Sequence, residues 1–61
     1  MSIQDIIDLM IEPDQQLIEV YDLNKEKTIY HGDACEIDYE TSQREIASID
    51  TVEGNKITFN V

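Results

Sequence analysis

The sequence KITFNV, residues 56–61, alternates polar and apolar side chains without a break. Ile57, Phe59 and Val61 fall on one face of an extended chain, and the polar residues between them fall on the other. Strict alternation is typical of a strand that is buried on one face only. The sequence therefore predicts a sheet with a covered apolar face and an open polar face.

A hairpin is expected around this strand. The preceding segment EIASIDTV, residues 45–52, is rich in β-forming side chains, and EGN, residues 53–55, supplies a turn that contains glycine.

A second hairpin is predicted earlier in the chain. The segment LIEVYDL, residues 17–23, sets Ile18 and Val20 on one face of a strand. NKEK, residues 24–27, supplies the turn, and TIYH, residues 28–31, returns as the second arm.

A helix is predicted at the N-terminus. Ser2 is a favourable N-cap, and Asp5 three residues later gives an aspartate version of the capping box. Pro13 is expected to end the helix. Its apolar face follows the i, i+3, i+4, i+7 pattern: Ile3, Ile6, Ile7 and Met10. We expect this face to pack against Ile57, Phe59 and Val61.

The segment between the hairpins, GDACEIDYETSQ, residues 32–43, has few apolar residues and predicts a loop with about one helical turn. The fold class is therefore α+β, with one helix packed on a four-stranded antiparallel sheet in the order helix, hairpin, acidic connector, hairpin. Residues 1–61 are expected to form a single small domain.

Composition limits where the protein works. Cys35 is the only cysteine, so no internal disulfide can form and a reducing compartment, the cytoplasm, is expected. Asp5, Asp8 and Glu12 interrupt the first apolar stretch, which argues against a secretory signal. No apolar run approaches the roughly 18 residues that a membrane span needs, so no membrane role is expected.

Acidic residues dominate the charge. The chain has 14 Asp and Glu against 4 Lys and Arg in 61 residues, a formal net charge of -10. Affinity for phosphates comes from Lys and Arg, so direct binding of nucleic acid is not expected and a charged partner should be basic. The alternative is that the acidity serves only solubility.

The segment HGDACEIDYE, residues 31–40, concentrates the side chains that could carry chemistry. His31 and Cys35 do not form the recurrent Cys and His pairs of a closed zinc site, and the acids do not match an EF-hand loop. Neighbouring carboxylates would disfavour a reactive thiolate at Cys35. The sequence predicts no metal, no cofactor and no catalytic residue.

A binding face that combines tyrosines with carboxylates is the remaining candidate, because tyrosine is enriched at protein interfaces. The residues assigned to it are Tyr21, Asp22, Asp33, Glu36, Asp38, Tyr39 and Glu40.

The segments EPDQQLIEVYDL, YHGDACEI and SIDTVEGNKITFNV, in this order, resemble small acidic proteins encoded by phages and prophages of Gram-positive bacteria. The resemblance implies a non-enzymatic inhibitor that places an acidic face in a basic nucleic-acid-binding site of a host protein, such as a CRISPR or other defence nuclease. The alternative is a small structural or adaptor module, bound through the uncovered sheet face or as a homodimer.

Overall fold

The computed structural model describes residues 1–51 and 54–61 and has the predicted α+β composition. Its elements, in chain order, are α1 (Ile3–Ile7), the 3-10 turn η1 (Pro13–Gln15), β1 (Leu17–Asp22), β2 (Lys27–Asp33), the 3-10 turn η2 (Ala34–Glu36), α2 (Tyr39–Ser42), β3 (Ser48–Thr51) and β4 (Lys56–Asn60). The end of the strand predicted at 45–52 and the start of the turn predicted at 53–55 lie outside the described residues.

The four strands form one mixed sheet in the order β2-β1-β4-β3. Both predicted hairpins are confirmed, since β1 pairs with β2 and β3 with β4 in antiparallel fashion. The prediction of a wholly antiparallel sheet is wrong, because β1 and β4 run parallel, with Leu17 opposite Lys56 and Ile18 opposite Ile57. These two strands carry the most deeply buried side chains of the sheet, which favours them at its centre.

Helix α1 begins as predicted. Ser2 Oγ accepts a hydrogen bond from the Asp5 amide at 3.3 Å, and the Asp5 carboxylate accepts one from the Ser2 amide at 2.9 Å. The helix nevertheless ends at Ile7 and does not continue towards Pro13. Asp8 places a negative charge at the negative end of the helix dipole, with no basic residue in the last turn to offset it, which disfavours continuation.

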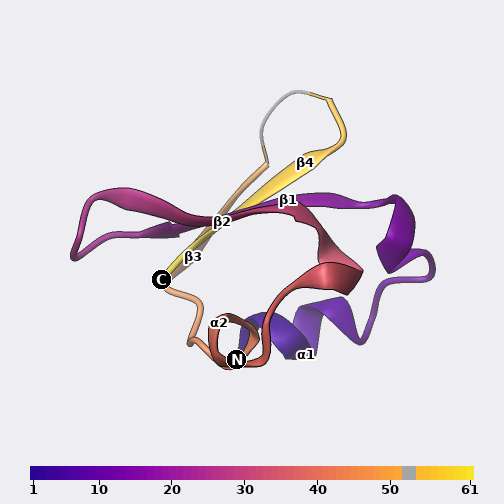
Figure 1. The fold of residues 1–61 in the computed structure, drawn as a ribbon, viewed down its shortest axis with the longest axis horizontal. Helices are drawn as coiled ribbons and strands as arrows, with labels where there is room; N and C mark the ends of the chain where they lie inside the picture. The colour runs from indigo at the N-terminus through magenta and orange to yellow at the C-terminus, as the bar shows by residue number, and fades with distance from the viewer. Residues whose placement is uncertain (52–53) are drawn as a thin grey trace.

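The covering layer, defined here as residues 1–16 and 34–47, lies on one side of the sheet (Figure 1). Among the described residues it closes a core of six buried apolar side chains: Ile3, Ile7, Ile18, Val20, Ala34 and Phe59. The predicted burial of Phe59 is confirmed, with an exposed fraction of 0%. None of the helices among residues 1–51 and 54–61 has the length and hydropathy of a membrane-spanning segment.

The connector contains the 3-10 turn η2 and a second short helix, α2, so the prediction of a single helix is wrong. η2 buries Ala34 and is tied to the segment before β1, because the Ala34 amide donates to Gln16 O at 2.9 Å. Helix α2 is capped by Asp38, whose carboxylate accepts from the Thr41 amide at 3.0 Å and from Thr41 Oγ1 at 2.9 Å. These hydrogen bonds therefore fix the backbone conformation of the connector.

The uncovered face of the sheet carries a network of polar side chains beside Leu17 and Tyr21 of β1. Glu19 accepts from Lys56 Nζ at 2.9 Å and from Thr28 Oγ1 at 2.6 Å, so three strands are linked through one carboxylate. Asn60 Nδ2 donates to Ser48 Oγ and to Asp50 Oδ2, both at 3.0 Å. Polar side chains on this face thus bind one another across the sheet.

Candidate functional site

Charge is unevenly distributed between the two layers. Eight of the 14 acidic residues, but only one of the 4 basic residues, belong to the covering layer. We call these eight residues, all of them exposed, the acidic layer: Asp5, Asp8, Glu12, Asp14, Glu36, Asp38, Glu40 and Glu45. The remaining basic residues lie in the sheet and its first turn, which leaves the covering layer strongly negative.

Arg44, the basic residue of the covering layer, is tied to Asp22. Arg44 Nη2 lies 3.2 Å from Asp22 Oδ2, and the Asp22 side chain is only 3% exposed. Asp22 Oδ1 also accepts from the amides of Asn24 and Lys25 at 2.9 and 3.0 Å. Hydrogen bonding by the Lys25 amide and then by Arg44 lowers the pKa of Asp22 below its ordinary value. Asp22, assigned to the binding face from the sequence, is therefore turned inward to hold the first turn.

The other assigned residues separate into two groups. Glu36, Asp38, Tyr39 and Glu40 lie together on η2 and α2, all exposed, with Tyr39 at 77%. Asp33 is half-buried at the end of β2 beside them. The hydrogen bonds from Thr41 lower the pKa of Asp38, so its carboxylate stays charged at a lower pH than an ordinary aspartate.

Tyr21 is not part of that group. It alternates along β1 with the buried Val20 and Asp22, so its side chain belongs to the uncovered face and is half-buried there. The structure therefore brings the connector residues together and separates Tyr21 and Asp22 from them.

Acids from the first sixteen residues join the connector acids in the acidic layer. Helix α1 packs beside α2, and η1 packs beside η2, which adds Asp5, Asp8, Glu12 and Asp14 to the same layer. The sequence pattern assigns Asp5 a role in capping the helix and places neither Asp5 nor Asp8 on a binding face. The packing of two segments far apart in sequence is what joins the two acidic groups.

The two residues weighed for metal or nucleophilic chemistry lie in different layers. His31 is exposed and pairs opposite Glu19, a residue of the uncovered face, whereas Cys35 is exposed on η2 in the covering layer. Among residues 1–51 and 54–61, no group of three or more His, Cys, Asp and Glu side chains could hold a metal ion.

Tyr30, the remaining tyrosine of the sheet, packs against the core. Its hydroxyl donates to Asp33 O at 2.6 Å, and burial raises the pKa of the phenol, with the Glu36 charge adding to the effect. A Cβ on Gly32 would come within 3.0 Å of that hydroxyl oxygen, so the glycine leaves room for the Tyr30 ring. Tyr30 is thus a structural residue beneath the connector.

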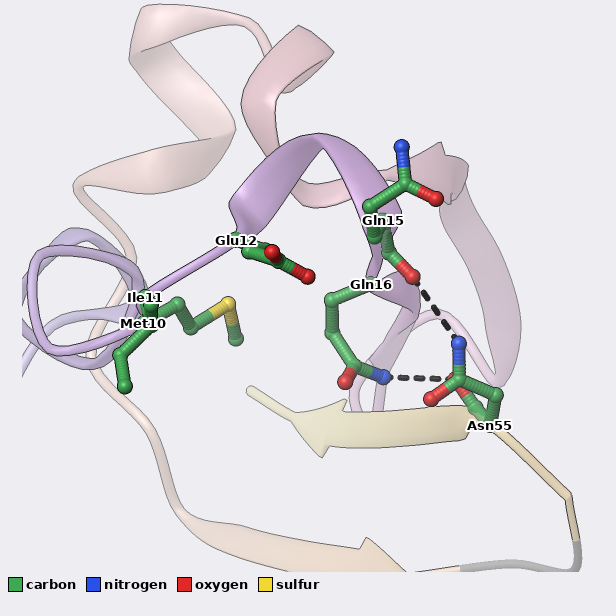
Figure 2. A pocket seen from close by; sticks show the side chains of 6 residues that line it. All are labelled: Met10, Ile11, Glu12, Gln15, Gln16 and Asn55. Atoms are coloured by element: carbon green, nitrogen blue, oxygen red, sulfur yellow. Dashed lines mark hydrogen bonds between the residues drawn. The ribbon is translucent and has the colours of Figure 1, made fainter.

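One hollow lies beside the acidic layer, between η1 and the start of β4 (Figure 2). It has a volume of about 680 Å³ and is lined by Met10, Ile11, Glu12, Gln15, Gln16 and Asn55. Gln16 Nε2 donates to Asn55 O at 2.6 Å, and Asn55 Nδ2 donates to Gln15 O at 2.9 Å. These bonds join the segment before β1 to the segment before β4.

The fold and this surface define a small α+β protein in which an acidic layer covers one face of a mixed sheet. No protein-family model, curated protein or solved structure matches the chain.

Proposed function

We propose that the protein is a non-enzymatic binding protein whose acidic layer occupies the basic nucleic-acid-binding groove of another protein. The observation that supports this most is the position of the acids: eight are exposed on the covering layer, while its only Arg is engaged by the buried Asp22. A surface of one sign attracts a surface of the other and speeds their association.

The dimensions of the molecule fit such a groove. Its principal extents are 30 × 25 × 17 Å. Over the longest of these, duplex DNA carries about 18 phosphate charges, at one per ~1.7 Å. The acidic layer together with Asp33 is thus of the same order of charge as the nucleic acid that it would replace.

The setting of the proposal comes from the sequence resemblance to phage and prophage proteins. In that setting the partner is a nucleic-acid-binding protein of the bacterial host cytoplasm, with a CRISPR or other defence nuclease as the leading class. The alternative, an adaptor or homodimer that uses the uncovered sheet face, has less support, because the polar side chains around Glu19 and Asn60 on that face are already hydrogen-bonded to one another.

The experiment begins with the partner that the wild-type protein captures from a host lysate. Four connector acids are then neutralised together: Asp33→Asn, Glu36→Gln, Asp38→Asn and Glu40→Gln. Asparagine can still cap α2, so the fold should persist, which circular dichroism checks. The variant should associate with the purified partner more slowly, and raising the salt from about 50 to 200 mM should weaken binding of the wild type.

The matched control compares single substitutions. Glu40→Gln and Glu26→Gln each remove one charge, but Glu26 lies in the turn between β1 and β2, outside the acidic layer. Only Glu40→Gln should slow association. Labelled DNA or RNA should be displaced from the partner by the wild type. A partner that holds nucleic acid and this protein at once, or a quadruple variant that binds at full strength, would rule the proposal out.

A further inference from the structure

The hollow between η1 and β4 combines an apolar wall with a carboxylate. Figure 2 shows the Met10 thioether and the Glu12 carboxylate both directed into it, from the segment that links α1 to η1. Ile11, at its edge, is 96% exposed, so this apolar surface is left open by the fold.

The amide side chains that line the hollow use most of their N–H donors on other groups, and one N–H of Gln15 is donated to Asp14 Oδ2 at 3.3 Å. Gln16 uses both N–H groups internally, on Leu17 O at 2.9 Å and on Asn55 O at 2.6 Å. Asn55 uses one N–H group on Gln15 O. Among the described residues, no hydrogen bond engages the side-chain oxygens of Glu12, Gln16 or Asn55. The hollow therefore offers acceptor oxygens and one negative charge.

We propose that this hollow receives an arginine side chain of the partner. The inference rests on the proposed function, because it names the anchor that a basic groove would place against the acidic layer. The guanidinium carries five N–H donors and no acceptor, which suits a site of carboxylate and amide oxygens. The aliphatic stem of the arginine packs on Met10 and Ile11.

Other occupants fit less well. An anion would meet the Glu12 charge, and a purely apolar side chain would cover Glu12 without supplying a donor, which carries a desolvation penalty. Arginine satisfies the wall and the acceptors together, and its five N–H donors in a fixed planar arrangement can reach more of the acceptor oxygens than the three donors of lysine.

The test uses capped arginine amide as a probe of the hollow alone, titrated into the ¹⁵N-labelled protein and followed by NMR. Amide shifts should move at residues 10–12 and 14–16 and at Asn55, since Pro13 has no amide proton. Glu12→Gln should weaken binding by about three- to fivefold, the size of one exposed ion pair. Asp14→Asn removes the same charge two positions away, outside the lining of the hollow, and should change binding less than twofold.

Three outcomes would overturn the inference. Capped norleucine amide, which has an apolar stem and no guanidinium, could bind equally well. The shifts could centre on residues 36–40 of the connector. Glu12→Gln and Asp14→Asn could weaken binding to the same extent. The competition experiment with nucleic acid is separate, so displacement of nucleic acid combined with any of these outcomes would leave the proposed function standing and remove only the arginine site.

Discussion

At the scale of single residues, Phe59 is the largest side chain with no exposure, so its packing should contribute strongly to stability. Phe59→Ala should lower the free energy of unfolding by about 3–5 kcal/mol, since it removes apolar contacts and leaves a cavity. That is a large share of the ~5–15 kcal/mol available to a small domain. Urea denaturation measures the loss, and Phe59→Leu, which keeps most of the apolar volume, should lose less. A change below about 1 kcal/mol for the alanine variant would contradict the packing described for β4.

Asp22 should contribute to the loss of stability at low pH. Its pKa is held below the ordinary 3.8 by the turn amides and Arg44, so the charged form stabilises the folded state at higher pH. That contribution is lost as the pH falls below 3.8 through the lower folded pKa. Between about pH 5 and pH 2 the melting temperature of Asp22→Asn should fall less steeply than that of the wild type.

The control for acid sensitivity is Asp14→Asn, an exposed substitution with the same change in net charge. The steep fall of the melting temperature with decreasing pH should remain in Asp14→Asn and become shallower in Asp22→Asn. It should not disappear in Asp22→Asn, because Glu19 and Asp38 also have lowered pKa values. Equal slopes for the two variants would show that the Asp22 contacts do not contribute to the pH dependence.

At the scale of elements, the order β2-β1-β4-β3 makes β1 and β4 the interior strands and leaves β2 and β3 at the edges. Backbone amides of Val20 in β1 and Phe59 in β4 should therefore exchange with solvent more slowly than those of β3. Hydrogen exchange followed by NMR measures this directly. Protection of β2 and β3 above that of β4 would contradict the parallel pairing at the centre.

The two hairpins could be predicted because their signals are local. Alternation in KITFNV and in LIEVYDL predicts which residues are buried. The short turns indicate that strands adjacent in sequence pair with each other. The pairing of β1 with β4 has no such signal, because alternation reads the same beside a parallel or an antiparallel neighbour. Sequence reasoning therefore found the pieces of the sheet and misjudged how the hairpins join.

The spacing of Asp22 in its strand indicates that its side chain faces the core. It follows Ile18 and Val20 at a spacing of two, which places it on the covered face with them. Residue types alone placed Asp22 on the binding face, whereas its position in the alternation places it on the covered face. The acids of α1 and η1 could not be joined to the connector in the same way, because only tertiary packing brings the two segments together.

At the scale of the whole molecule, like charge should keep copies apart. The net charge of -10 and the polar uncovered face both oppose self-association near pH 7, so sedimentation or light scattering should find a monomer there. Near the sequence pI of about 4.1 the repulsion disappears and association should increase. A stable dimer at pH 7 in high and low salt would instead support the homodimer alternative.

The parallel pairing at the centre of the sheet also has a consequence for synthesis of the chain. Leu17 of β1 pairs with Lys56 of β4, 39 positions later, so a ribosome working at about 5–20 residues per second delivers the partner strand about 2–8 s after β1. During that interval the first hairpin has neither its central neighbour nor Phe59 to complete its core. Proteases and chaperones therefore meet this protein in its most open form while it is still a nascent chain.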